Sequence, residues 1–250
     1  MLTCGETEML LPGDRIDDLQ RAGLRIIQNE SSWRFGMDSV LLADFACPAP
    51  RDRVIDLGCG DGALLLLLWG RENTLTGDGI EIRPDAALRA EKSFALNGLA
   101  ERLHVIRGDW TEPSLLREGQ YTLAVANPPY EEAAQSGMLQ TEARARLRGG
   151  WDALFLSAAR ALKPGGRFAL VYPARETDRV LRWMCAAGFA LKRTRAVYTR
   201  PGKDAKLCLS EAVLGARPGG VRMLPPLAVW TGDGKRELAK IYGTERTRET

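Results

Sequence analysis

Short apolar runs alternate along the chain with longer segments that carry helix start and stop signals. The runs are continuous rather than alternating with polar residues, which is typical of strands buried on both faces of a parallel sheet. The pattern predicts strands at 24–28, 54–57, 79–82, 103–106, 121–126 and 167–172. It predicts helices at 40–46, from 63, at 83–97, 151–162 and 175–187, with Asp38 and Ser39 as caps of the first helix.

The order of these elements favours one fold class. Strands that alternate with helices form βαβ units, so we expect an α/β, doubly wound, mostly parallel sheet. After residue 188, two strand-like stretches, 191–199 and 206–214, are joined without a helix, which predicts a C-terminal antiparallel hairpin. Because there is no internal repeat and no low-complexity linker, we expect a single domain over 1–250, with 1–14 as a loose N-terminal extension.

Composition excludes several kinds of chemistry. His104 is the one histidine among 250 residues, so the chain cannot form a histidine-rich metal site. No other position can supply the histidine of a catalytic triad. The five cysteines form no C-x-x-C pair, so we expect no metal site, no disulfide framework and a reducing compartment. No apolar run approaches the roughly 20 residues of a membrane span, and the N-terminus does not resemble a secretory signal. We therefore expect a cytoplasmic protein that does not bind membranes.

Charge is divided unevenly between the two halves of the chain. Residues 1–130 carry 13 basic and 20 acidic residues, a net of −7, and residues 131–250 carry 22 and 12, a net of +10. A basic half beside an acidic one indicates two tasks, one of which could involve a polyanion.

The first cluster with candidate chemistry is D-x-G-x-G-x-G, between a predicted strand and a helix. Glycines at such a turn let a ligand approach the backbone closely, although a turn without a ligand is the alternative. The spacing is not G-x-G-x-x-G and no Walker lysine follows, which disfavours dinucleotides and triphosphates. The cluster resembles the S-adenosylmethionine loop of class I methyltransferases, which implies a Rossmann-like fold and that cofactor. The resemblance implies that Asp56 lies near the amino end of the methionine moiety, beside Gly58, Gly60 and Gly62, that Glu81 holds the ribose, and that Asp109, otherwise a surface acid, contacts adenine.

The second cluster is Asn127-Pro128-Pro129-Tyr130, at the end of the predicted strand 121–126. A rigid proline turn is one interpretation. The cluster also resembles the N-P-P-Y motif of amino-group methyltransferases. An exocyclic amino group is a poor nucleophile, and acceptors at the Asn127 side chain and the Pro128 carbonyl can direct its lone pair toward a methyl donor. Tyr130 can stack on a base, which contributes roughly 1–3 kcal/mol. The motif also occurs in enzymes that methylate DNA adenine, rRNA bases or a release-factor glutamine, so it leaves the substrate open.

Segments at both ends of the chain resemble the bacterial tRNA1(Val) adenine-37 N6-methyltransferases. This resemblance implies methyl transfer to N6 of an adenine in RNA, with adenine-37 of tRNA(Val) as the specific expectation. It implies that Phe35, Gly36, Asp38 and Asn127 border the cofactor; an aromatic core anchor and a helix cap are the structural alternatives for the first three. The segments are 15–20, 24–29, 34–45, 201–205, 219–226 and 240–243.

Basic residues gather in two segments of the second half. They suit contacts to RNA phosphates, although a solvated basic face is the alternative. After Tyr130, the loop 131–149 departs from the family pattern, which weakens the assignment to this particular tRNA. A protein that binds RNA without catalysis, on the same scaffold, is the alternative from another functional class. The candidate RNA contacts are Arg144, Arg146, Arg148, Lys192, Arg193, Arg195, Arg200, Lys203 and Lys206.

Overall fold

The structure is a computed structural model, and it describes residues 10–29, 36–128, 150–229 and 241. Nine strands of these ranges form one sheet, in the order β10-β8-β9-β7-β6-β3-β4-β5, with β11 also paired to β8. Their bounds are β3 (Arg53–Leu57), β4 (Thr76–Glu81), β5 (Leu103–Arg107), β6 (Tyr121–Ala126), β7 (Leu162–Pro173), β8 (Phe189–Tyr198), β9 (Ala205–Leu214), β10 (Arg222–Met223) and β11 (Leu227–Ala228).

The direction of the strands confirms the predicted fold class. Strands β3 to β7 pair in parallel, in the order β7-β6-β3-β4-β5. Strand β9 is antiparallel to both β7 and β8, so the last two long strands form the expected hairpin. The short strands β10 and β11 run parallel to β8 and were not predicted, because two residues carry no hydrophobic pattern.

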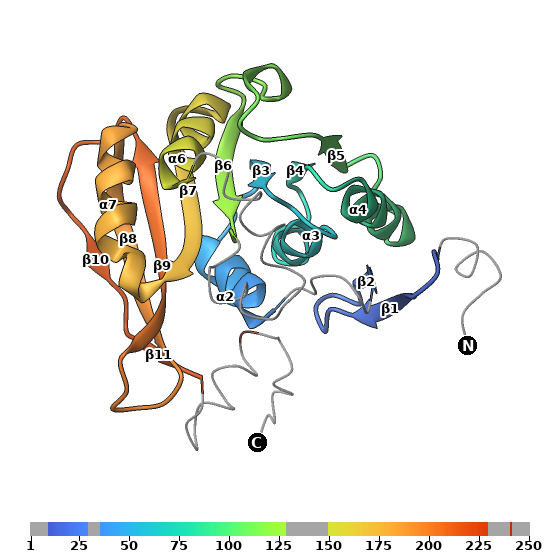
Figure 1. The fold of residues 1–250 in the computed structure, drawn as a ribbon, viewed down its shortest axis with the longest axis horizontal. Coiled ribbons are helices and arrows are strands. Elements are labelled where there is room, and N and C mark those ends of the chain that lie inside the picture. Colours follow the sequence, from blue (N-terminus) through green and yellow to red (C-terminus); the bar gives the residue numbers. More distant parts are fainter. Residues whose placement is uncertain (1–9, 30–35, 129–149, 230–240, 242–250) are drawn as a thin grey trace.

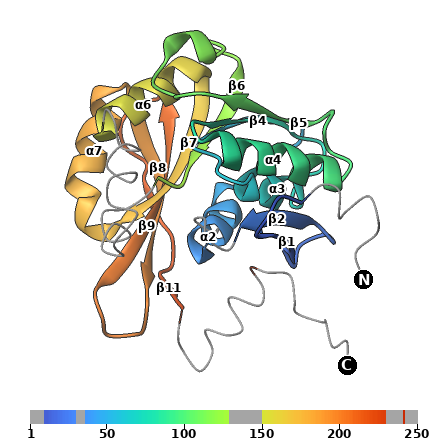
Figure 2. The ribbon, with the colours of Figure 1, turned by 45° about the vertical axis from the view of Figure 1, so that its right-hand side comes forward.

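Helices cover both faces of the sheet (Figures 1 and 2). Successive residues of β6 show why: Leu123 and Val125 enter one hydrophobic cluster, whereas Ala124 and Ala126 enter the other. The first cluster contains α2 (Met37–Ala46), α3 (Ala63–Trp69) and α4 (Pro84–Leu96), and the second contains α6 (Gly150–Ala161) and α7 (Thr177–Ala186). Two short 3₁₀ helices, η1 (Pro113–Leu115) and η4 (Ala174–Glu176), lie in connections.

A separate two-stranded sheet precedes this core. It consists of β1 (Asp14–Asp18) and β2 (Arg25–Asn29) and packs against α4, where the backbone N–H of Ile27 donates to Oγ of Ser93 at 2.9 Å. The strand β2 was predicted, but β1 was not. Its sequence, DRIDD, is almost entirely polar, so its pairing with β2 determines its conformation more than its own pattern does.

Two local predictions need correction. Helix α2 begins at Met37, with Gly36 in the extended N-cap position and no side-chain cap hydrogen bond, so the expected capping by Asp38 and Ser39 is wrong. Since the helix starts earlier, both residues lie inside its first turn. Strand β7 begins at Leu162 rather than at residue 167, and the glycine-containing segment that was expected to separate helix from strand lies within it, where the pairing with β6 is irregular.

Candidate functional site

The glycine-rich loop, Glu81 and Asn127 meet at one edge of the sheet. Strand β3 lies between β4 and β6, all three are parallel, and the candidate residues stand at or directly after their carboxyl ends. The chain leaves β3 toward β4 on one side and later returns to β6 on the other. In doubly wound folds such a switch point is where ligands bind.

A pocket lies at this edge. It brings together residues from the first turn of α2, the loop after β3, the start of α4 and the end of β6. Ser39, Asp56, Gly58, Cys59, Gly60, Asp61, Ala63, Leu64, Arg83 and Asn127 line it.

Backbone hydrogen bonds fix the glycine-rich loop. The N–H groups of Gly58 and Cys59 both donate to the carbonyl of Ile80 at 3.0 Å, which ties the loop to β4. Gly58 and Gly60 have left-handed φ angles of +92° and +57°, and a Cβ atom built on either would meet no atom of the described residues within 4 Å. The space beside these two glycines is therefore open to a ligand.

The carboxylate of Glu81 connects the loop to α4. Its Oε2 accepts from the N–H of Gly60 at 2.9 Å, and its Oε1 accepts from the backbone N–H and Nε of Arg83 at 2.9 and 3.2 Å. Glu81 is 6% exposed. These contacts place a buried carboxylate beside the middle of the loop, where the sequence predicted a group that holds ribose hydroxyls.

Asp56 is buried at the end of β3. Its Oδ2 atom has no hydrogen-bond partner among the described residues. Burial, with a smaller contribution from the negative charge of Glu81, raises the pKa of Asp56 to about 8. A cation in the pocket would favour the ionised carboxylate, so Asp56 is suited to a positively charged ligand.

A buried ion pair between Asp61 and Arg89, which the sequence did not reveal, connects the glycine-rich loop to α4. Nε of Arg89, on α4, donates to Oδ1 of Asp61 at 2.8 Å, and its NH2 group contacts Oδ2 of Asp85 at 2.7 Å. Burial raises the pKa of Asp61, and Arg89 opposes that rise. Since Asp61 and Arg89 are 28 residues apart, no local pattern could have identified the pair.

Asn127 projects from the end of β6 toward α2. Its Nδ2 atom donates to Oγ of Ser39 at 3.0 Å. Pro128 is buried, whereas Pro129 and Tyr130 lie outside the described residues. Ser39 therefore joins the site as a residue that sequence reasoning had assigned to helix capping.

The other candidate cofactor residues that the structure describes belong to neighbouring elements and are not among the residues that line the pocket. Asp38 is in the first turn of α2, where burial raises its pKa and the charge of Lys206 opposes the rise. Asp109 follows β5, and its Oδ1 accepts from both the N–H and Oγ1 of Thr111 at 2.8 Å. The N–H of the preceding Gly108 donates to the Glu81 carbonyl at 3.0 Å, so Asp109 stands near Glu81 on the neighbouring strand. Gly36 and Gly62 are the N-caps of α2 and α3, and Phe35 lies outside the described residues.

The structure divides the basic residues that the sequence had grouped together. Arg200 and Lys203 are exposed in the turn between β8 and β9, and Lys206 is exposed at the start of β9. Strand β8 runs in the same direction as the parallel strands, so this turn extends beyond the edge that carries the pocket. Lys192 lies toward the opposite end of β8, where its Nζ donates to the carbonyls of Arg217 and Gly219.

Arg193 is engaged by groups of the protein, and Arg195 is partly buried. The guanidinium of Arg193 contacts both carboxylate oxygens of Glu211, the carbonyl of Phe45 and the face of the Phe45 ring. Arg193 therefore has a structural role, and its contact with an RNA phosphate stays a prediction. Nε of Arg195 is buried without a hydrogen-bond partner among the described residues. Arg144, Arg146 and Arg148 lie outside the described residues.

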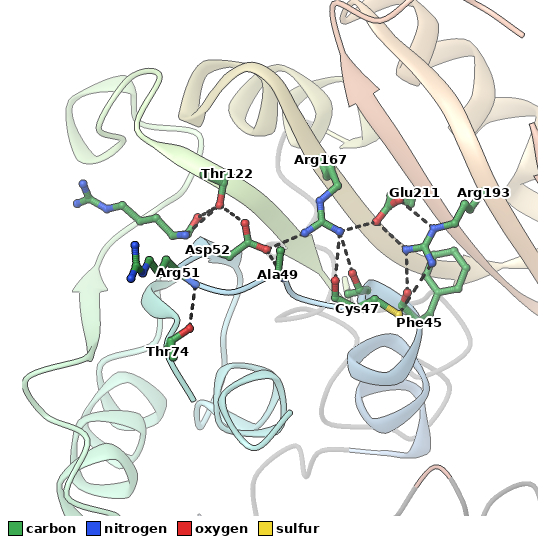
Figure 3. A network of polar contacts seen from close by, with 12 residues as sticks. Phe45, Cys47, Ala49, Arg51, Asp52, Thr74, Thr122, Arg167, Arg193 and Glu211 are labelled. Atoms are coloured by element: carbon green, nitrogen blue, oxygen red, sulfur yellow. Dashed lines mark hydrogen bonds and ion pairs between the residues drawn. The ribbon is translucent and has the colours of Figure 1, made fainter. Parts of the chain in front are cut away.

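Two arginines hold the C-terminal end of α2 (Figure 3). Arg167 on β7 donates to the carbonyls of Ala46 and Cys47 at 3.2 and 3.3 Å, while Arg193 on β8 donates to that of Phe45 at 3.0 Å. Both arginines contact Glu211 of β9, and NH2 of Arg167 also contacts Oδ2 of Asp52 at 2.7 Å. Helix α2 has no basic residue in its last turn, so these arginines supply the cations that its terminal carbonyls favour.

No helix in the described ranges is long and apolar enough to cross a membrane. No group of three or more His, Cys, Asp or Glu side chains in that part of the chain could hold a metal ion.

Comparison with known proteins extends these observations. Residues 35–182 match the methyltransferase small domain family. A tRNA1(Val) (adenine(37)-N6)-methyltransferase of Tolumonas auensis is 33% identical over 187 residues, which is 74% of this chain and 78% of the relative. The protein of that name from Aeromonas hydrophila is 35% identical over 70% of this chain and 75% of the relative. A solved structure from Agrobacterium tumefaciens, described as a predicted O-methyltransferase, aligns with a TM-score of 0.64 at 22% identity, over 77% of this chain and 88% of that one.

Proposed function

We propose that this chain, which belongs to the methyltransferase small domain family, transfers a methyl group from S-adenosylmethionine to N6 of an adenine in RNA, specifically adenine-37 of tRNA(Val). One observation carries the proposal. Asn127, the first residue of the N-P-P-Y motif, lines the same pocket as Asp56 and Gly60 of the cofactor-type loop. A group that accepts amino protons and a loop suited to the methyl donor therefore lie side by side.

The pocket fits S-adenosylmethionine in two respects. The open space beside Gly58 and Gly60 accommodates a ligand against the backbone, and the unpartnered Oδ2 of Asp56 is an acceptor for an ammonium group. Bound there, the cofactor would supply an electrophilic methyl group on a positively charged sulfur. Glu81 and Asp109 would hold the ribose and the adenine, in the order of the strands that carry them.

The residues of the chain act on the amino group of the substrate. The side-chain oxygen of Asn127 and the carbonyl of Pro128 each accept one N–H, which directs the nitrogen lone pair away from both. An adenine amino group delocalises its lone pair into the ring, so this orientation increases its reactivity. Positioning of this kind can supply several kcal/mol of the barrier reduction, about 7–11 kcal/mol in favourable cases, without a metal or a histidine.

The basic turn supports RNA as the substrate class. Arg200, Lys203 and Lys206 are exposed at the edge that carries the pocket. Cations at that position can contact phosphates while a base that has left its stack reaches Asn127.

The test is methyl transfer to tRNA. Purified protein and labelled S-adenosylmethionine are incubated with bulk tRNA from cells that lack the corresponding gene, and the nucleosides are identified by mass spectrometry. We expect N6-methyladenosine at position 37 of tRNA(Val), and no transfer by N127A with cofactor affinity retained. Label in rRNA, DNA or a release factor instead of tRNA would assign the site to another amino group. Cofactor binding without transfer to any of these would favour the non-catalytic alternative.

A further inference from the structure

The hydrogen bond between Asn127 and Ser39 links the end of β6 to the first turn of α2. Oγ of Ser39 accepts from Nδ2 of Asn127 at 3.0 Å. Ser39 is 6% exposed, and both residues line the pocket. The contact therefore lies in the pocket, at the point where the amino group must be held.

In this contact the Asn127 amide has one orientation, with Nδ2 toward Ser39. The nitrogen and the oxygen of an amide lie on opposite sides of its Cγ atom, so Oδ1 points away from Ser39. A side chain turned by 180° would present a donor where an acceptor is required, and it would repel the N–H of the substrate. The terminal torsion of asparagine has an intrinsically broad distribution, so contacts with neighbouring groups select its value.

We propose that Ser39 is a positioning residue for amino-group methylation, which orients the Asn127 amide so that Oδ1 accepts a proton of the substrate amino group. The inference rests on the proposed function, because it assigns a role within that reaction. Ser39 acts through Asn127 and need not touch the substrate.

The scaffold around Ser39 suits this role. The N–H of Ser39 donates to the carbonyl of Gly36 at 3.2 Å, which holds it in the first helical turn. At the other end of α2, Arg167 and Arg193 hold the terminal carbonyls. Since Arg167 and Arg193 hold the C-terminal end of the helix, the hydroxyl acceptor lies on a supported element, as precise positioning requires.

The experiment compares S39A, which removes the acceptor, with S39T, which keeps a hydroxyl. Because a misplacement of 1 Å can cost about 100-fold in rate, we expect S39A to lower kcat by about 10- to 100-fold. The dissociation constant for S-adenosylmethionine should change by less than about twofold, and S39T should recover most of kcat. S157A is the matched control, since Ser157 is a buried serine of α6 outside the pocket, and it should leave kcat unchanged.

Two further measurements distinguish a role of Ser39 through Asn127 from other effects of its substitution. In the N127A background, S39A should add no further loss of kcat, because the residue through which Ser39 acts is gone. Exchange of the Asn127 side-chain amide protons with water, followed by NMR, should be slow in the wild type and S39T but faster in S39A. The exchange measurement does not depend on whether tRNA is the substrate.

The outcomes are distinct. An S39A variant with wild-type kcat and unchanged amide exchange overturns the inference while leaving the proposed function intact. A variant that loses cofactor affinity at unchanged kcat also overturns it, because Ser39 would then be a cofactor contact. If the wild type methylates no RNA, the proposed function fails, and unchanged amide exchange in S39A would then remove the inference as well.

Discussion

Nε of Arg89 lies 2.8 Å from Oδ1 of Asp61, and the two side chains are only 3% and 4% exposed. The pair joins α4 to the glycine-rich loop beneath the candidate cofactor site. Breaking a buried pair by removing one partner leaves an uncompensated charge, which is costly. The loop therefore depends on an ion pair in which Asp61 lines the pocket and Arg89 holds it from α4.

The first prediction concerns this ion pair. The substitution R89M should lower the free energy of unfolding by about 3–5 kcal/mol, since Asp61 would remain buried without its cation. Chemical denaturation measures the loss. D85N is the control, because Asp85 is the exposed partner of Arg89, and it should cost at most about 1 kcal/mol. Equal losses of unfolding free energy in R89M and D85N would contradict the argument that the buried pair is the costly one to break.

The second prediction concerns pH. Because the pKa of Asp56 is raised to about 8, the carboxyl is protonated at neutral pH in the absence of ligand. A cationic cofactor favours the ionised form, so binding must release a proton. Affinity for S-adenosylmethionine should therefore increase as the pH rises from 6 toward 8, by at most about tenfold per pH unit.

Calorimetry in buffers with different ionisation enthalpies measures the released proton directly. D56N is the matched variant, because it cannot titrate and it reports the ionisation of the ligand alone. It should bind more weakly and show less dependence on pH. If the affinity of the wild type fell between pH 6 and 8 while that of D56N did not, ionisation of Asp56 would not favour cofactor binding.

The third prediction compares two glycines of one loop. Gly60 and Gly62 both have left-handed φ angles, so alanine is strained at either position. A Cβ atom at Gly62 would lie 2.7 Å from Cε1 of Phe94, whereas one at Gly60 would enter open space. G62A should therefore lose about 1–3 kcal/mol of stability more than G60A does, as measured by denaturation. G60A should instead lose cofactor affinity, and retained affinity would argue that the ligand lies elsewhere.

The fourth prediction concerns the basic turn. The double substitution R200A/K203A should weaken tRNA binding and reduce its salt dependence by roughly one unit of slope for each phosphate contact removed. K192A is the control, since Lys192 lies toward the other end of β8 and donates to the carbonyls of Arg217 and Gly219. Filter-retention measurements of tRNA binding at several salt concentrations distinguish the double variant from K192A. A larger effect of K192A would place the RNA surface at the opposite edge of the sheet.

The sequence predicted the sheet because buried strands carry their own apolar patterns and glycine or proline boundaries. Strand β1 was missed because its residues are polar and its partner determines its conformation. The loop and motif residues could be identified because each directly follows a strand. Ser39 and Arg89 could not, since their contacts connect residues 88 and 28 positions apart. The ion pair of Arg193 could not be predicted either, because a charge count does not reveal that Glu211 faces it on the neighbouring strand.

The contacts of Glu211 bear on whether a truncated form of the chain can fold. It lies on β9 between two arginines, and together they hold the last carbonyls of α2, a helix from the first fifth of the chain. A fragment that ends at residue 188 would retain every strand that borders the pocket, yet it would lack Arg193 and Glu211 and expose the edge of β7. Such a fragment would keep Arg167 but lose one of the two arginines that support the helix that carries Ser39. We therefore predict that the hairpin folds with the rest of the sheet and is not a detachable module for substrate binding.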